Sequence, residues 1–482
     1  MNESILQKGV DVQGLTTAIV LPGTGLFADR GGRGLREVGP LTKIGGVSLF
    51  QRTVLTLQRA GIRQLIVLAG AEEEVLKQTL LRGSRVNIPV RWMPIREFPL
   101  DDPRTWEVLA AEVQGCCLIA GAQAVFSKHV IERLRSAVQD GQALVVARKT
   151  AGGERPAGPR NPSLECRDHR VIAFHDQPSG EADQIAADLV VLPAATMGNR
   201  GVPFEEGGGS LEGGAMPIRR WLDRAAADGR VSVVATDDQS ALWYRDVWDH
   251  SSAKAAERTL FRSLKGEYEG FVDRYFNRKV SRLFTNLFLF LGCSPNVITM
   301  VATFVGLLAA AGFAFGTYQA GIVAALLFQL SAVIDCCDGE VARLTFSESP
   351  FGAWLDITMD NIVHMTVFAG IAWGAYARYK GTGSEWIPPI LGAASVTGNA
   401  LSFWLVTKAQ KIGATRGWRT SRQAAWTGFI LNNVASRDFS IILLLFAILD
   451  KLDWFLWIAA IGSTLFAVLM LLVIRPSAIA RA

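Results

Sequence analysis

Residues 295–474 contain long stretches without a charged side chain, whereas residues 1–270 carry most of the charge in a mixed pattern. A chain of 482 residues is too long for one typical domain, so two or more are expected. Half of the residues are hydrophobic and 19% are charged, which is apolar for a soluble protein. The sequence therefore predicts a polar domain followed by a domain embedded in a lipid bilayer.

Charge and cysteine usage exclude several classes of protein. The net charge of +5 is small for this length and gives no case for nucleic acid, although basic residues beside a membrane would suit anionic headgroups. The six cysteines form no C-x-x-C, so neither a disulfide framework nor a zinc site is indicated. Residues 1–13 are polar and do not resemble a signal peptide, so a domain before the first span should stay in the cytoplasm.

Residues 1–250 are expected to form an α/β domain. Short apolar runs predict strands at 17–21, 64–69, 116–120 and 143–147, and helical patterns lie at 54–60, 73–81 and 130–137. Strands separated by helices imply βαβ units, so we predict a Rossmann-like fold with a mainly parallel sheet. The Gly- and Pro-rich residues 150–163 and 199–214 are expected to be loops.

Residues 251–292 are expected to connect this domain to the membrane, beginning with a charged linker helix over 251–270. Between 271 and 291, apolar residues recur at helical spacing. Basic residues fall mostly between them, at Arg274, Arg278, Lys279 and Arg282. This pattern predicts a basic amphipathic helix on the membrane surface, and packing against the soluble domain is the alternative.

Residues 293–482 are expected to form an all-α domain of six transmembrane helices. Apolar segments lie near 296–316, 319–338, 353–376, 387–407, 437–449 and 453–474, several of them close to the roughly 20 residues that cross a bilayer. The positive-inside rule agrees with a cytoplasmic N-terminal domain, because a basic loop and tail then lie inside. Arg378 and Lys380 would then lie on the opposite side of the membrane, which counts weakly against this orientation. We expect an integral protein of a bacterial inner (plasma) membrane or its equivalent.

Four aspartates lie where apolar spans are predicted, and a carboxylate in a bilayer usually marks a functional site. Asp335 and Asp338 are three residues apart at the end of one span, and Asp356 and Asp360 are four apart near the start of the next. Each pair shares one helical face, so two adjacent helices would direct four carboxylates at one place. Pro350 and Gly352 would allow the chain to reverse between them.

Such close carboxylates would repel one another unless cations bind. Hard oxygen ligands suit Mg²⁺, Mn²⁺ or Ca²⁺, and the cluster can hold two ions that clamp a pyrophosphate. Gly339 and Ala342 lie one turn after Asp335 and Asp338 and leave room for a ligand, and Arg343 offers a cation for phosphate oxygens. Aspartates that merely pair with arginines between helices are the alternative.

The run Asp335-x-x-Asp338-Gly339-x-x-Ala342-Arg343, followed by Gly352, Asp356 and Asp360, resembles the signature of the CDP-alcohol phosphatidyltransferase family. Every defining position is filled, and Ser294-Pro295-Asn296 resembles the entry to the family's first span. The resemblance covers roughly residues 271–474.

The resemblance implies a role for each position. Asp335, Asp338 and Asp356 would bind Mg²⁺ or Mn²⁺, and Asp360 would deprotonate the acceptor hydroxyl and also contact a metal. Gly339, Ala342 and Gly352 would accommodate a CDP-alcohol donor together with the first two aspartates, and Arg343 would bind its phosphates. CMP would leave, and the acceptor would be a lipid or a polyol phosphate.

Secondary candidates lie in the loop before the fifth span. In family members that use inositol phosphate, basic residues of this region bind the phosphate, and here the candidates are Lys408, Lys411, Arg416, Arg422 and Arg437. A solvated loop is the alternative. His364, one turn past Asp360, is expected to be a packed histidine rather than a metal ligand. Gly306, Gly312 and Gly462 permit a homodimer without requiring one.

The N-terminal domain resembles sugar-phosphate nucleotidyltransferases, through residues 18–25, 45–49 and 59–62. Gly23 and Gly25 lie in a turn whose N–H groups can receive a triphosphate, and Arg30, Arg33 and Arg36 could bind phosphate. Two departures stand out. Gly39 replaces the family's lysine, and Ala122 replaces its metal-binding aspartate, whereas Asp246 matches a second aspartate.

Losing this cation and this metal-binding carboxylate should lower the rate of nucleotidyl transfer by several orders of magnitude. We therefore predict a non-catalytic or regulatory N-terminal domain. The fusion also resembles bifunctional enzymes that make CDP-inositol and then inositol phosphodiesters. A CDP-polyol such as CDP-inositol is therefore the expected donor, with CDP-diacylglycerol as the alternative. Two rivals remain: a bifunctional enzyme whose N-terminal domain makes the CDP-alcohol from CTP, and a non-catalytic membrane protein that binds a nucleotide lipid.

Overall fold

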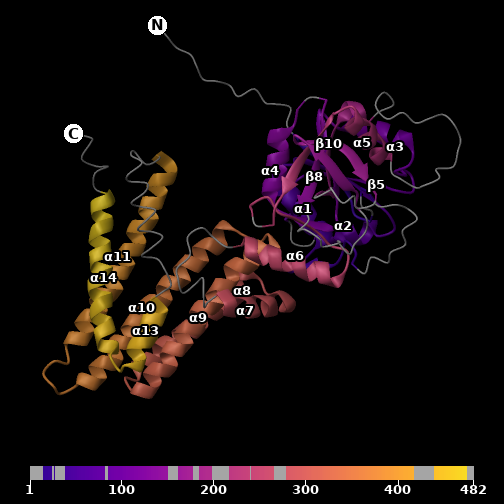
Figure 1. The fold of residues 1–482 in the computed structure, drawn as a ribbon. Coiled ribbons are helices and arrows are strands. Elements are labelled where there is room, and N and C mark those ends of the chain that lie inside the picture. Colours follow the sequence, from indigo (N-terminus) through magenta and orange to yellow (C-terminus); the bar gives the residue numbers. More distant parts are fainter. Residues whose placement is uncertain are drawn as a thin grey trace, which may run out of the picture. The chain divides into compact units, whose positions relative to one another are not determined.

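The computed structural model describes residues 15–23, 26–27, 38–81, 85–139, 141–149, 161–176, 184–197, 217–238, 240–264, 278–416 and 439–474. The chain divides into two compact units, Met1–Ser263 and Leu264–Ala482. The first, indigo to magenta in Figure 1, is a sheet covered by helices, and the second consists of helices.

The first unit contains thirteen described strands and six described α-helices. The strands are β1 (Thr17–Leu21), β2 (Lys43–Ile44), β3 (Val47–Ser48), β4 (Gln64–Ala69), β5 (Val90–Pro94), β6 (Cys116–Gly121), β7 (Ala124–Phe126), β8 (Ala143–Lys149), β9 (Ser163–Arg167), β10 (Arg170–His175), β11 (Gln184–Pro193), β12 (Val231–Thr236) and β13 (Tyr244–Asp246). The helices are α1 (Leu49–Arg59), α2 (Glu73–Leu81), α3 (Pro103–Glu112), α4 (Lys128–Ala137), α5 (Pro217–Ala227) and α6 (His250–Ser263), with a 3-10 turn, η1 (Ala194–Thr196).

The large sheet has the strand order β5-β4-β1-β6-β11-β8-β12-β10-β9. Strands β5, β4, β1 and β6 are parallel neighbours, as βαβ units require, and β8 is parallel to β12. Strand β11 is antiparallel to both β6 and β8, and β10 is antiparallel to β9 and β12. The α/β prediction is confirmed, but the mainly parallel sheet is wrong beyond β6. Parallel neighbours need a crossover connection, usually a helix, and none is described between β8 and β11, where the β9–β10 hairpin lies instead.

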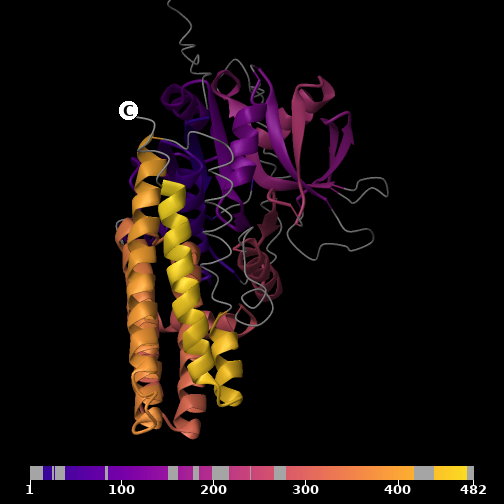
Figure 2. The ribbon, with the colours of Figure 1, turned by 90° about the vertical axis from the view of Figure 1, so that its left-hand side faces the viewer.

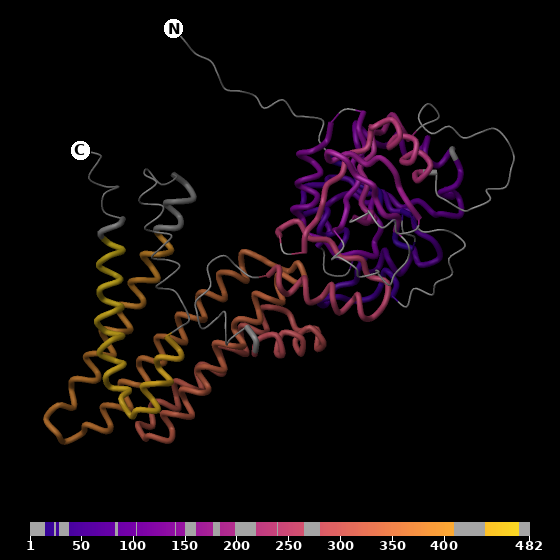
Figure 3. The backbone as a smooth tube through the Cα atoms, viewed as in Figure 1, coloured from indigo at the N-terminus to yellow at the C-terminus, as the bar shows by residue number. Residues whose placement is uncertain are grey.

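Helices cover both faces of this sheet, which can be followed in the tube of Figure 3. Because side chains alternate along a strand, Ala18 and Val20 pack with α1, α2 and α4, whereas Ile19 and Leu21 pack with α3 and α5. Local sequence fixes several helix starts. The side chains of Ser48, Asp102 and Ser127 each accept a hydrogen bond from a first-turn N–H of α1, α3 and α4.

The second unit consists of seven described helices. They are α7 (Arg278–Leu291), α8 (Pro295–Ala314), α9 (Tyr318–Thr345), α10 (Pro350–Tyr379), α11 (Ile387–Arg416), α13 (Phe439–Ile448) and α14 (Leu452–Ile474). Helices α11 and α14 pack along each other and run side by side in Figures 1 and 2. The apolar core joins α8, α9, α10, α11, α13 and α14.

Within the described residues, four helical segments are long and apolar enough to cross a membrane: Pro295–Ala314, Tyr318–Thr345, Ile387–Lys408 and Leu452–Leu471. The predicted helical membrane domain is thereby supported, and the count of six remains a prediction. Helices α10 and α13 account for the difference between the four segments found and the six predicted. Helix α10 has 30 residues and carries Asp356 and Asp360, and the described part of α13 has 10 residues.

Helices α8 and α10 touch backbone to backbone through glycines. A Cβ atom on Gly370 would overlap the carbonyl oxygen of Ala310, and one on Gly374 would overlap that of Phe313. Gly306 lies against Val363 of the same helix pair. Small residues allow this close approach in membrane bundles. Gly306 and Gly312 are therefore used inside the unit, whereas a Cβ on Gly462 would meet no atom within 4 Å.

Candidate active site

Three carboxylates of α9 and α10 meet beside α8, which packs against both helices. Asp335, Asp338 and Asp356 each offer an oxygen atom, and these atoms all lie within 4.8 Å of one another. Asp335 and Asp338 are 5% and 6% exposed, and Asp356 is half-buried. Charges of one sign so close together favour a bound cation, and carboxylate oxygens are ligands for hard divalent ions. The donor set therefore fits a divalent metal.

Asp360 lies one turn beyond Asp356 on α10 and is half-buried. It is not among the three residues whose ligand atoms come together. The spacing of the aspartates thus brings three of the four predicted ligands into one group, and Asp360 follows on the same face of the helix.

The chain reversal between the two helices differs from the expected one. Helix α9 ends at Phe346, which adopts a left-handed conformation with φ 57°. Helix α10 then begins with Pro350 in its first turn, and Ser349 Oγ accepts a hydrogen bond from the Gly352 N–H at 2.9 Å. Proline suits a first helical turn because its missing N–H is not needed there. Phe346, rather than Pro350 or Gly352, provides the unusual backbone conformation.

The predicted donor-binding residues surround the aspartates along both helices. Arg343 is exposed, and its guanidinium would lie 3.6 Å from a Cβ atom placed on Gly339. A Cβ atom on Gly352 would lie 3.2 Å from Asn296 Oδ1. Ala342 is half-buried. Within about two turns of the aspartates, α9 and α10 thus carry a cation and small residues, a chemistry suited to a phosphorylated nucleotide.

Thr299, which belongs to the first-span entry that resembles the family but received no role from the sequence, contacts one of the predicted ligands. Its Oγ1 donates a hydrogen bond to Asp338 Oδ2 at 2.5 Å, and Thr299 is 3% exposed. The hydroxyl reaches across from α8 to α9 and fixes one oxygen of the carboxylate. A threonine that follows the Ser294-Pro295-Asn296 entry was the available signal.

The N-terminal unit contains a second set of polar residues around Tyr244. The Tyr244 hydroxyl donates to Asp246 Oδ1 at 2.8 Å and accepts a hydrogen bond from the Asp188 N–H at 3.0 Å. Burial, with the nearby charges of Asp246 and Asp188, raises the pKa of Tyr244 well above its ordinary value. The phenol therefore stays protonated. Asp246 is thus held in a hydrogen bond beside a residue, Asp188, that sequence reasoning missed.

Asp188 lies in the middle of buried strand β11, beside the end of β6. Its Oδ1 accepts a hydrogen bond from the Leu26 N–H at 3.1 Å, just past the predicted nucleotide loop. A Cβ atom on Gly23 would lie 3.0 Å from Glu72 Oε1. Two carboxylates therefore lie against this loop. Gly25, Arg30, Arg33 and Arg36 lie outside the described residues.

Residues 293–478 match the family described as CDP-alcohol phosphatidyltransferase. They form a CDP-alcohol phosphatidyltransferase domain. The chain is therefore an enzyme of the transferase class, and the resemblance read from its aspartate motif is confirmed. This domain contains all four aspartates and Thr299.

Relatives extend the similarity beyond the transferase domain. A protein of Rubrobacter xylanophilus named bifunctional IPC transferase and DIPP synthase is 28% identical over 82% of this chain and 88% of its own length. A Thermococcus kodakarensis protein of the same name is 26% identical over 72% and 74%. The structure of the inositol-1-phosphate CTP transferase from T. maritima covers 51% of this chain and 95% of its own at 12% identity, with a TM-score of 0.39, too low to support an inference.

Of the secondary candidates of the transferase domain, Lys408 and His364 have described side chains. Lys408 is exposed, with its Nζ 4.8 Å from the ring centroid of Trp404. The backbone of Lys411 and Arg416 is helical, but their side chains, like Arg422 and Arg437, lie outside the described part. His364 packs edge-on to Phe439, with ring centroids 4.8 Å apart.

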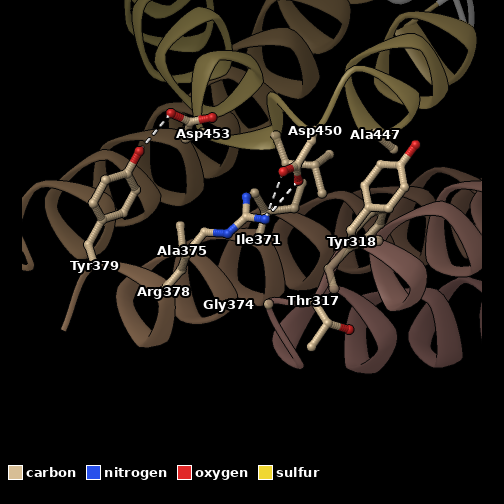
Figure 4. A pocket seen from close by; sticks show the side chains of 14 residues that line it. Thr317, Tyr318, Ile371, Gly374, Ala375, Arg378, Tyr379, Ala447, Asp450 and Asp453 are labelled. Carbon is tan, nitrogen blue, oxygen red and sulfur yellow. Dashed lines mark hydrogen bonds and ion pairs between the residues drawn. The ribbon is translucent and has the colours of Figure 1, made fainter.

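The opposite end of the transferase domain contains a small cavity of about 30 Å³ (Figure 4). Arg378 Nη2 donates to both oxygens of Asp450, at 2.8 and 2.9 Å, and Tyr379 donates to Asp453 at 3.0 Å. The space suits about one water molecule. It joins α10 to the α13–α14 turn far along the helices from the aspartates, so it is separate from the active site.

Proposed function

We propose that the transferase domain uses the site at Asp335, Asp338 and Asp356 to move a phosphoalcohol group from a CDP-linked donor to a hydroxyl acceptor. The acceptor oxygen attacks the phosphorus that carries the donor alcohol, the bond from this phosphorus to the bridging oxygen breaks, and CMP leaves. The meeting of three carboxylates within 4.8 Å is the observation that carries the proposal. A cluster that only bound a nucleotide would not need a further carboxylate one turn away.

Each residue has a distinct task in this reaction. Asp335, Asp338 and Asp356 would hold Mg²⁺ or Mn²⁺, with two ions as the expected number, and such ions would supply positive charge for the leaving phosphate. Asp360 takes the proton of the acceptor hydroxyl, which suits a carboxylate that lies outside the three-carboxylate group. Arg343 binds the donor phosphates, and Gly339, Ala342 and Gly352 leave room for the cytidine.

We further propose six transmembrane helices, with α10 and a longer α13 joining the four apolar segments. Helices α8, α10 and α13 then run away from the aspartates, and α9, α11 and α14 return. The N-terminal domain, residues 1–250, lies in the cytoplasm, because Lys408 and the basic residues after it fall on that side. Helix α7 of the connecting region 251–292 lies on the membrane surface, and a homodimer stays a prediction.

The names of the relatives favour a polyol donor. An enzyme named IPC transferase and DIPP synthase supports CDP-inositol as donor and inositol phosphate as acceptor, and CDP-diacylglycerol is the second candidate. An inositol phosphate acceptor requires cations, for which Lys408, Lys411, Arg416, Arg422 and Arg437 are the candidates.

The N-terminal domain is proposed to be non-catalytic. A triphosphate at the Gly23 turn would meet the Glu72 carboxylate, and Asp188 already accepts a hydrogen bond from Leu26 N–H beside the turn. Both effects oppose the binding of an anion. The relatives' names support the bifunctional rival, which predicts pyrophosphate release from CTP and inositol phosphate.

The test is CMP release by the purified full chain in detergent. CDP-inositol, CDP-diacylglycerol and CDP-glycerol are each paired with inositol phosphate and lipid acceptors, with Mg²⁺ or Mn²⁺. We expect one pairing to release CMP and Asp360→Asn to slow the release by about 10²- to 10⁴-fold. Nucleotide binding without CMP release from any pairing would instead support the binding-protein rival. Pyrophosphate release from CTP in a parallel assay would overturn the non-catalytic N-terminal domain.

A further inference from the structure

Glu340 is a buried carboxylate that the reaction described above does not use. It lies in α9 two residues after Asp338 and is 6% exposed. It does not belong to the group of three carboxylates that can share a metal. A buried carboxylate is costly unless hydrogen bonds compensate it, so its partners indicate what it does.

Both oxygens of Glu340 receive hydroxyl groups from α7. Thr285 Oγ1 donates to Oε2 at 2.6 Å, and Ser281 Oγ donates to Oε1 at 3.3 Å. The two donors are four residues apart, hence on one face of α7, and both are 0% exposed. The thiol of Cys337 also donates to the Ser281 carbonyl oxygen at 3.5 Å. One face of α7 is thus fixed to the helix that carries Asp335 and Asp338.

The other face of α7 is apolar and exposed. Phe290 is 87% exposed, Leu283 is 72% exposed and Leu291 is 61% exposed. Arg282 is exposed beside Leu283. Large apolar side chains beside a basic residue, next to the first span, match a helix at the boundary between headgroups and acyl chains. Helix α7 therefore has a lipid-facing side and a side that holds Glu340.

Glu340 and Asp338 point to nearly opposite sides of α9, because two residues correspond to roughly 200° around a helix. Thr299 of α8 holds Asp338, and Ser281 and Thr285 of α7 hold Glu340. A helix that is held from both sides has little freedom to rotate about its axis. Rotation of α9 would move Asp335 and Asp338 away from Asp356.

We propose that Glu340 is a positioning residue that couples the docking of α7 on the lipid surface to the orientation of Asp335 and Asp338. The inference rests on the proposed function of these aspartates. It assigns to Ser281, Thr285 and Glu340 a role in activity that does not require contact with the substrate. The lipid surface fixes α7, and α7 fixes the metal-binding face of α9.

The first test compares matched double variants of the full chain. Ser281→Ala/Thr285→Val removes both hydroxyls from Glu340. Ser331→Ala/Thr303→Val removes two buried hydroxyls that donate to the carbonyl oxygens of Ala302 and Thr299. We expect about tenfold lower kcat and a several-fold higher Mg²⁺ concentration for half-maximal activity in the first variant only, with the KM for the donor little changed. Equal behaviour of the two variants overturns the inference.

Substitutions of Glu340 separate position from charge. Glu340→Gln can still exchange hydrogen bonds with both hydroxyls and should keep at least half of the activity, whereas Glu340→Leu should match the Ser281→Ala/Thr285→Val variant. A loss in Glu340→Gln as large as that in Glu340→Leu would assign the effect to charge and overturn a positioning role. Retained activity in Glu340→Gln would also show that substitution of this buried residue does not by itself prevent folding.

Lipid coupling is tested by non-additivity in vesicles that contain anionic lipid. Leu283→Ser/Phe290→Ser should lower CMP release in the wild-type background and have little further effect in the Ser281→Ala/Thr285→Val background. Additive losses would refute the coupling. Mn²⁺ affinity, measured by electron paramagnetic resonance without turnover, separates the two proposals. Normal Mn²⁺ binding without CMP release would defeat the proposed function, and equal Mn²⁺ affinity in both double variants would defeat the inference.

Discussion

Replacing Thr299 with valine should disable the transferase site without removing any predicted metal ligand. The Thr299 hydroxyl donates to Asp338 Oδ2 at 2.5 Å, and both residues are buried, with 3% and 6% exposure. Valine keeps the branched shape of threonine, so the packing of α8 against α9 should change little. Asp338 would lose the hydrogen bond from the Thr299 hydroxyl and would turn more freely.

The size of the loss in kcat/KM follows from the charge of the hydrogen-bond acceptor, the Asp338 carboxylate. A hydrogen bond to an ionised group contributes about 1.5–3 kcal/mol. At about 1.4 kcal/mol for each factor of ten, its loss lowers kcat/KM by about 10- to 150-fold if the transition state needs the fixed carboxylate. Because Asp338 is a proposed metal ligand, the Mg²⁺ concentration for half-maximal activity should rise as well.

Thr303→Val is the matched control. Thr303 lies one turn further along α8 and is 7% exposed, and its hydroxyl donates to the Thr299 carbonyl oxygen at 2.8 Å rather than to a carboxylate. CMP release is measured for both variants against donor and Mg²⁺ concentration. If Thr299→Val retains the kcat/KM and the Mg²⁺ dependence of Thr303→Val, the orientation of Asp338 does not limit the reaction.

Three further predictions concern separate parts of the chain. Asp360→Asn should lower kcat by about 10²- to 10⁴-fold while Mn²⁺ affinity changes little, because Asp360 lies outside the three-carboxylate group; a large loss of affinity would make it a ligand instead. Tyr244→Phe should destabilise the N-terminal unit by about 1–3 kcal/mol, since two buried hydrogen bonds are lost, and faster hydrogen exchange in β6 and β11 would report it. Arg378→Gln should lower the free energy of unfolding by less than about 1 kcal/mol, because its ion pair with Asp450 is nearly half exposed. CMP release should be unchanged, and a large loss of CMP release would show that this distant cavity contributes to catalysis.

The aspartate cluster could be predicted from the sequence because helical spacing alone places each pair on one face. The meeting of the two pairs required in addition that α9 and α10 both pack against α8, which helical spacing does not state. Thr299, Ser281 and Thr285 could not be found in this way. Their roles depend on which helices cross at Asp338 and Glu340, and a serine or threonine in an apolar helix most often bonds its own backbone, as Thr303 does.

The N-terminal sheet shows where periodicity fails. Strands β1, β4 and β6 were predicted because each is a short apolar run between helices. Strand β11 is ten residues long and buried along most of its length, but nothing local to it states whether it runs parallel or antiparallel to β6. Its central Asp188 is a buried charge in an apolar run, and that was the signal for a polar site at this point of the sheet.

The glycine contacts of α8 with α10 continue from Gly374 back to Gly306, which lies against Val363, seven residues from Asp356. Gly374 and Asp356 are 18 residues apart, roughly 27 Å along a helix that rises about 1.5 Å per residue. A tilt of α10 by about two degrees about Gly374 would move Asp356 by about 1 Å, which is enough to break the bond between a carboxylate and a metal ion. The close packing of α8 on α10 therefore limits the tilt that would pull Asp356 away from the other two carboxylates.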